Sequence, residues 1–168
     1  MSAETLNPLS EEDAARALTR CCGSSRWVRG MLARRPFADD EALHAAADEV
    51  WATMERADIL EAFTHHPRIG GDLDALREKF GGDVKWSGDE QASIHDASEA
   101  VLTKLRDGNV AYEARYGFIF IVCATGKSAA EMLALLQGRM NHEPGDELAI
   151  AAAEQAKITH LRLEKLDE

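Results

Sequence analysis

Apolar side chains recur every three to four residues along most of the chain, which is the spacing of one face of an α-helix. One clear apolar stripe consists of Leu43, Ala46, Ala47, Val50, Trp51 and Met54. An earlier stripe consists of Ala14, Ala17, Leu18, Cys21 and Cys22. The pattern predicts an all-α protein, a single-domain bundle of roughly eight to nine helices.

Capping residues and helix breakers divide this pattern into elements. Ser10 and Ser128 each stand three residues before an acidic side chain, as helix N-caps do, and Pro144 suits a first helical turn. Gly23 and Gly108 are predicted to end helices. The expected helices cover residues 11–22, 27–32, 39–54, 72–80, 87–107, 109–116, 129–140 and 144 to the C-terminus, and a further helix is expected to pass into a loop over residues 63–71.

One segment, GFIFIVCATG at residues 117–126, interrupts the helical pattern. Its β-branched and aromatic residues favour a strand, but a lone buried strand would leave backbone groups unpaired. The segment is therefore either an extended, buried connection or a helix disguised by its bulky residues. An extended connection would leave backbone N–H and C=O groups available to a ligand.

Composition and charge narrow the class of protein. The chain has 168 residues, 45% of them hydrophobic and 29% charged, which indicates about one soluble globular domain. A net charge of -11 argues against nucleic acid as a partner. The three cysteines form neither a disulfide framework nor a zinc-binding spacing. No signal peptide or membrane span is recognisable, so we expect a cytoplasmic protein with no membrane partner.

The segment FTHHPRIGGD, residues 63–72, places two histidines at the end of a predicted helix. Pro67 disfavours helical dihedrals at His66 and restricts that residue. The histidines could form a helix C-terminal cap, a metal site with Glu61, or a catalytic acid–base. The metal alternative lacks any recognised ligand motif.

Two further polar positions are predicted to face inward. Counting back from the apolar stripe of the helix after Trp86 puts Glu90 and Gln91 toward the core. Glu90 could instead complete a capping box with Ser87. Arg162 falls within an otherwise apolar face of the last helix, where it could extend to solvent, pair with a carboxylate of the chain, or bind a substrate carboxylate. Nucleophile-elbow, phosphate-loop and dinucleotide motifs are missing from the sequence.

Five segments, in this order, resemble the family of 2-oxo-4-hydroxy-4-carboxy-5-ureidoimidazoline (OHCU) decarboxylases. They are CCGSSRWVRGMLARRPF, THHPRIGG, WSGDEQAS, YEARYGFIFIVCATGKSAAEM and ITHLRLEKL. The likeness extends from about Leu9 to Leu166. It implies one domain over residues 1–168, with residues 1–8 flexible, and a homodimer without metal or organic cofactor. The implied activity is a lyase of purine and urate catabolism that forms S-allantoin.

The resemblance also implies site residues. The family's catalytic histidine corresponds to His66 and its acidic partner to Glu90. The implied substrate-binding residues are Pro67, Ser87, Gln91, Phe120, Ile121, Val122, Cys123, Ala124 and Arg162, those of 120–124 through their backbone. Ile119 departs from the family pattern, because many relatives have proline there.

The chemistry of this reaction agrees with the residues present. The substrate carries a carboxylate and a hydroxyl on a ring carbon beside a C=N bond, which can accept the electron pair left by carbon dioxide. Such a substrate requires no cofactor as electron sink. Two other classes stay open from the sequence, namely a metal-dependent hydrolase using Glu61, His65 and His66, and a non-catalytic helical interaction module.

Overall fold

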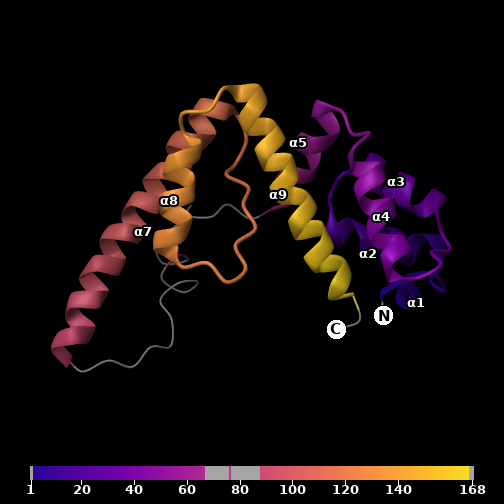
Figure 1. The fold of residues 1–168 in the computed structure, drawn as a ribbon, viewed down its shortest axis with the longest axis horizontal. Coiled ribbons are helices and arrows are strands. Elements are labelled where there is room, and N and C mark those ends of the chain that lie inside the picture. The colour runs from indigo at the N-terminus through magenta and orange to yellow at the C-terminus, as the bar shows by residue number, and fades with distance from the viewer. Residues whose placement is uncertain (1, 67–75, 77–87, 167–168) are drawn as a thin grey trace. The chain divides into compact units, whose positions relative to one another are not determined.

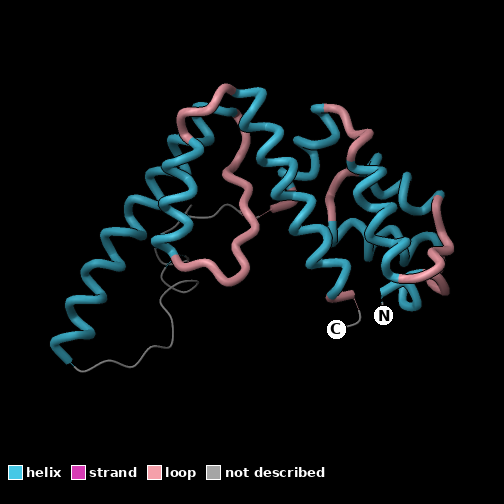
Figure 2. Tube along the Cα trace, in the orientation of Figure 1, coloured by secondary structure: helices cyan, strands magenta, loops and turns pink. Residues whose placement is uncertain are grey.

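The computed structural model describes residues 2–66, 76 and 88–166, and over 88–98 it describes the backbone alone. Within these residues the chain is helical and has no strand, which confirms the all-α prediction (Figures 1 and 2). The helices are α1 (Ser2–Leu6), α2 (Glu11–Cys21), α3 (Ser25–Ala33), α4 (Asp40–Trp51), α5 (Arg56–Thr64), α7 (Gly88–Tyr116), α8 (Ala129–Arg139) and α9 (Pro144–Glu164). Of the expected helix over 72–80, only Leu76 lies within the described residues.

The described residues form two compact units, the first of which comprises residues 2–66, 121–123 and 149–166. In this unit α3 packs against α2, α4 and α5. Trp27 is fully buried, and its indole Nε1 donates to the backbone oxygen of Ala47 at 3.1 Å. Trp51 Nε1 donates to the backbone oxygen of Ala152 in α9 at 3.0 Å. The two tryptophans thus join the N-terminal helices to one another and to α9.

The N-terminal residues were expected to be flexible, but the structure places a helix there. In α1, Ala3 and Leu6 are buried in the core of the first unit. The side chain of Asn7 exchanges hydrogen bonds of 2.8 Å with the backbone N–H and C=O of Phe37. Burial of apolar side chains and these two bonds stabilise a segment whose short sequence pattern gave no helical signal.

The second unit comprises the described residues of 88–120 and 124–148, and α7 and α8 lie side by side within it (Figure 1). Gly108 does not end a helix, as the sequence suggested, because α7 continues unbroken to Tyr116. A Cβ on Gly108 would lie 2.8 Å from Leu136 Cδ2 of α8. This glycine therefore permits close helix packing rather than terminating the helix.

Residues 117–126 form an extended, buried connection, the first of the two alternatives that the sequence left open (Figure 2). Gly117 and Gly126 have φ values of +82° and +76°, a region that other residues rarely adopt, and they turn the chain at the two ends of the connection. Phe118, Phe120 and Ile121 between them are buried. No helix among the described residues is long and apolar enough to cross a membrane.

Candidate active site

His66 lies just beyond the end of α5, in the first unit. Its backbone N–H donates to the carbonyl of Phe63 at 3.1 Å, so it closes the final turn without belonging to the helix. Phe63 is itself 1% exposed and holds the end of α5 in the core. The helix stops here because the following residue is Pro67, which disfavours helical dihedrals at His66. The imidazole is half-buried.

Both ring nitrogens of His66 meet side chains of α9. Nε2 lies 2.5 Å from Gln155 Oε1, and Nδ1 lies 3.5 Å from Arg162 Nη2. A guanidinium can only donate, so Nδ1 is the accepting nitrogen. Nε2 then carries the hydrogen and donates it to the amide oxygen of Gln155. The contacts assign a neutral imidazole with its lone pair on Nδ1.

Gln155 is held in turn by Thr159, one helical turn further along α9. Gln155 Nε2 donates to Thr159 Oγ1 at 3.0 Å, and Thr159 Oγ1 donates to the backbone oxygen of Gln155 at 2.9 Å. Gln155 is 0% exposed and Thr159 is 4% exposed. A buried amide with all its polar atoms engaged has a single favourable orientation.

The pKa of His66 lies below the ordinary value of 6.5 for histidine. Burial is the main cause, because it disfavours the charged imidazolium, and the electrostatic effects of Arg162 and of the neighbouring His65 act in the same direction. The hydrogen bond to Gln155 opposes them. His66 is therefore neutral near pH 7, the state in which an imidazole accepts a proton.

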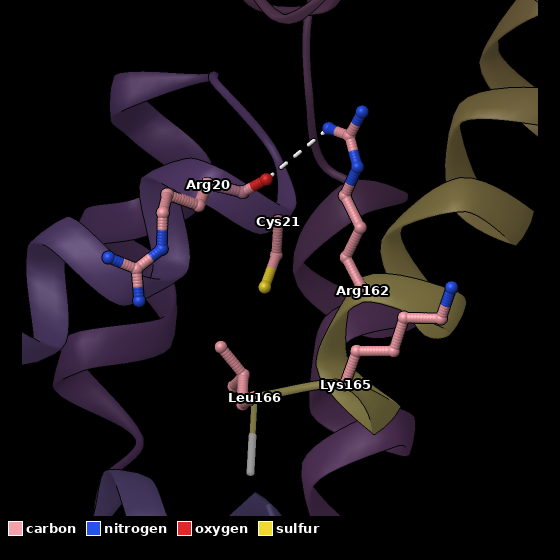
Figure 3. Close-up of a pocket in the computed structure, with 5 residues that line it drawn as sticks. All are labelled: Arg20, Cys21, Arg162, Lys165 and Leu166. Carbon is pink, nitrogen blue, oxygen red and sulfur yellow. Dashed lines mark hydrogen bonds between the residues drawn. The ribbon is translucent and has the colours of Figure 1, made fainter. Parts of the chain in front are cut away.

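Arg162 lies between His66 and a pocket of about 510 Å³ in the first unit. The pocket is lined by Arg20, Cys21, Arg162, Lys165 and Leu166 (Figure 3). Arg162 Nη1 donates to the backbone oxygen of Arg20 at 3.3 Å, which anchors the guanidinium to the end of α2. Burial raises the pKa of the Cys21 thiol to about 12, so this cysteine stays protonated and is a poor nucleophile.

The metal-site alternative requires Glu61, His65 and His66 to converge, but each has another role here. Both carboxylate oxygens of Glu61 accept hydrogen bonds from Ser25, at 2.8 Å from its N–H and 2.7 Å from its hydroxyl. His65 covers Gly23, where a Cβ would lie 2.3 Å from the histidine Cγ. Within the described residues, no group of three or more potential ligands could hold a metal ion.

The remaining predicted site residues are only partly described. Glu90 and Gln91 lie in the first turn of α7, and their side chains, like Pro67 and Ser87, fall outside the described part of the structure. Ile121, Val122 and Cys123 belong to the same unit as His66, whereas Phe120 and Ala124 group with the second unit.

The backbone of the connection is less available to a ligand than expected. The N–H of Cys123 donates to Glu154 Oε1 of α9 at 3.1 Å. This bond satisfies one buried backbone donor of the extended segment from within the protein.

Sequence reasoning missed Gln155 and Thr159. The buried stripe of α9 is Glu147, Ala151, Gln155, Thr159 and Leu163, spaced by four residues. Most of these residues are polar, so a search for apolar periodicity selected the neighbouring stripe through Ile158, Arg162 and Leu166. A detectable signal was the spacing of Gln155, Thr159 and Arg162, which puts all three near one face of a helix.

The described residues define an all-helical protein with a neutral, half-buried histidine held by an amide and facing a guanidinium. A family model described as OHCU decarboxylase matches residues 7–164. The chain therefore belongs to the OHCU decarboxylase family.

Individual relatives and a solved structure agree with this assignment. The chain is 40% identical over 148 residues to the uric acid degradation bifunctional protein TTL of Arabidopsis thaliana, covering 87% of this chain and 45% of that protein. It is 31% identical over 135 residues to the OHCU decarboxylase of Amia calva, covering 79% and 74%. A crystal structure of OHCU decarboxylase in the presence of (S)-allantoin matches with a TM-score of 0.72 and 34% identity, covering 94% and 98%. The chain thus spans less than half of the Arabidopsis relative.

Proposed function

We propose that this chain is a carboxy-lyase that converts OHCU to S-allantoin in urate degradation, without a metal or organic cofactor. The observation that carries the proposal is the neutral imidazole of His66, whose accepting Nδ1 lies 3.5 Å from Nη2 of the Arg162 guanidinium. Family membership supplies the substrate class.

The reaction exchanges a carboxylate for a proton. The bond between the ring carbon and the carboxylate breaks and carbon dioxide leaves. The electron pair forms a double bond to the neighbouring carbon, and the C=N pair moves onto the ring nitrogen, which takes up a proton. The hydroxyl on the first carbon then loses its proton as the product carbonyl forms, and the neighbouring carbon gains one. The protein must therefore orient the carboxylate and move protons on one face of an enediol-like intermediate.

His66 and Arg162 suit these two tasks. Arg162 would bind a carboxylate through its donors, which would bring the hydroxyl on the same carbon close to His66 Nδ1. Because burial keeps His66 neutral, it would accept the hydroxyl proton and return it in the protonation step. General acid–base catalysis of this kind contributes about 10²–10⁴-fold in rate.

Further roles follow from family membership. Glu90 would assist His66 in proton transfer, and Gln91 would bind a polar group of the substrate. We also assign Pro67 and Ser87 to the substrate site, together with the backbone of residues 120–124. The assembly would be a homodimer in the cytoplasm, acting on a small molecule.

Stereoselective product formation tests this function directly. OHCU decays without enzyme, so release of carbon dioxide alone is a poor indicator. With OHCU generated in the cuvette, the protein should produce optically active S-allantoin, followed by circular dichroism, and dialysis against EDTA should leave the rate unchanged. Racemic allantoin formed at the spontaneous rate would contradict the proposal. Loss of activity in EDTA that returns with added zinc or iron would favour a metal-dependent enzyme.

The roles of Glu90 as cap and as catalyst are separated by Glu90→Gln. Glutamine can still complete a capping box, but it cannot carry the negative charge. We expect a variant of parental stability with kcat/KM lowered at least about tenfold. If Glu90→Gln had the same kcat/KM as the parent, Glu90 would act only as a helix cap.

A further inference from the structure

We propose that Gln155 is a positioning residue that fixes His66 in the Nε2–H tautomer, so that Nδ1 is the nitrogen that exchanges protons with the substrate. The catalytic part of this inference rests on the proposed function. The structural part, which concerns the tautomer, does not.

The hydrogen bonds around Gln155 have one consistent direction. The hydroxyl of Thr159 faces two backbone carbonyls, of Gln155 at 2.9 Å and of Cys21 at 3.4 Å, and both can only accept. The hydroxyl hydrogen is therefore committed, and the oxygen accepts from the amide NH₂ of Gln155. The amide oxygen must then face His66, where it can accept only from Nε2–H.

The opposite orientation of the amide is disfavoured at both ends. A rotated amide would direct its oxygen at Thr159 Oγ1 and its NH₂ at His66 Nε2. Nε2 would then have to accept, which would put the hydrogen on Nδ1, facing the guanidinium of Arg162. Two donors would oppose each other across the 3.5 Å between Nδ1 and Nη2. Since Gln155 is fully buried, water cannot compensate for these mismatches.

An amide has a different effect on the imidazole from the carboxylate that often orients catalytic histidines. A carboxylate at Nε2 would stabilise the imidazolium and raise the pKa of His66. The uncharged amide orients the ring, and although its hydrogen bond also raises the pKa of His66, burial outweighs it, so His66 remains neutral. Gln155 thus combines a defined tautomer with a ring able to accept a proton near pH 7.

Two substitutions at Gln155 separate positioning from simple packing. Gln155→Glu should move the acid limb of the kcat/KM profile upward by about one pH unit or more, because the added charge favours imidazolium. Gln155→Leu fills similar volume without the hydrogen bond, so its acid limb should not rise while kcat falls by about 10–100-fold. If Gln155 had a purely structural role, Gln155→Glu would not shift the acid limb upward, and the pH profiles of the Glu and Leu variants would not differ.

The chain provides a matched control in Gln137, an exposed glutamine of α8. Gln137→Glu and Gln137→Leu make the same chemical changes at an exposed position of the second unit, and their pH profiles should coincide with that of the parent. Profiles of the Gln155 variants that also coincide with the parent would overturn the proposal. An equal shift in Gln137→Glu would assign the effect to net charge instead.

Nitrogen-15 NMR of histidine-labelled protein tests the tautomer without reference to activity, with His66→Asn identifying the signal. The parent should show protonated Nε2 and unprotonated Nδ1 at neutral pH, and Gln155→Leu a mixture of tautomers. Thr159→Val retains Gln155 but allows its amide to rotate, so it should also give a mixture of the two tautomers. This variant replaces Gln155→Leu in the test if Gln155→Leu fails to fold. A protonated Nδ1 of His66 in the unsubstituted protein would overturn the inference. A parent with the expected tautomer but no decarboxylase activity would instead contradict the proposed function.

Discussion

Two buried polar networks share the same stripe of α9, and they differ in charge and in how they end. Around Glu147, in the second unit, the network is ionic and closed. Arg139 Nε and the hydroxyl of Tyr112 each lie 2.5 Å from Glu147 Oε1, and His142 Nδ1 lies 2.9 Å from Oε2. Around Gln155, in the first unit, the network is built on an uncharged amide and ends at His66 Nδ1, which faces the Arg162 guanidinium.

We interpret the Glu147 network as structural and the Gln155 network as part of the proposed active site. Glu147 is 0% exposed, and both its oxygens are occupied by groups of the protein, so the network has no position left for a ligand. The Gln155 network leaves an accepting nitrogen beside a guanidinium that borders a pocket. Changes around Glu147 should therefore reduce stability, whereas changes at the His66 end should reduce activity.

The largest expected stability loss comes from Arg139→Met. This change leaves Glu147 buried without its strongest counter-charge, and breaking such a pair typically costs about 3–5 kcal/mol. Urea unfolding followed by circular dichroism measures the loss. Arg16→Met provides the control, since the Arg16 side chain is 67% exposed and its ion pairs with Glu12 and Asp13 should contribute less than about 1 kcal/mol. Equal losses in the two variants would contradict a structural role for the Glu147 network.

Gly23→Ala should reduce both stability and activity. The new methyl group would lie 2.3 Å from Cγ of His65, so the histidine must move, and forced repacking costs about 1–3 kcal/mol. Because His66 follows directly, kcat/KM should also fall.

Gly138→Ala is the matched control for that substitution. Gly138 lies within α8 and nothing would approach its Cβ within 4 Å. Alanine should stabilise that helix by about 0.5–1 kcal/mol with unchanged activity. If Gly23→Ala gained stability in the same way, the position of His65 would not require a glycine at residue 23.

Tyr112→Phe should have a smaller effect. Burial raises the pKa of the Tyr112 hydroxyl, which therefore stays protonated and donates to Glu147. Removing the hydroxyl while keeping the ring should cost about 1–2 kcal/mol in thermal or urea unfolding. Activity per folded molecule should remain within a few-fold of the parent. A large loss of kcat without loss of stability would mean that the network also serves catalysis.

The smallest effect is a pH dependence of stability due to His66. Its folded-state pKa lies below the unfolded value near 6.5, so in that interval the unfolded chain binds more protons. The stability contribution of the neutral ring is thus present above pH 6.5 and decreases as the pH falls toward the folded-state pKa. Between about pH 7 and about pH 5, His66→Asn should lose less unfolding free energy than the parent. If the unfolding free energies of His66→Asn and the parent changed equally with pH, the pKa of His66 would not be lowered in the folded protein.

The fold was largely predictable because its apolar residues follow helical spacing. The stripe beginning at Leu43 became α4, and Ser10 and Ser128 cap α2 and α8 as expected. One error involves a glycine, since Gly108 was interpreted as a helix end. Local sequence does not reveal that a glycine faces a neighbouring helix, because that requirement arises only in the packed structure.

The site was predictable in part, for a different reason. Pro67 marks His66 as a residue outside regular structure, and Arg162 was recognised as a cation on an inward face. Gln155 and Thr159 were missed because buried polar residues carry no hydrophobic signal, and their burial makes sense only once His66 is in place. A search for inward-facing polar residues at a spacing of four would have detected them.

The most direct test of the account is the His66→Asn enzyme, assayed for S-allantoin formation and unfolded in urea under the same conditions. We expect kcat/KM to fall by about 10²–10⁴-fold, with the free energy of unfolding close to that of the parent. A folded variant with activity within a few-fold of the parent would remove the imidazole from proton transfer, and with it the functional meaning of the network that ends there.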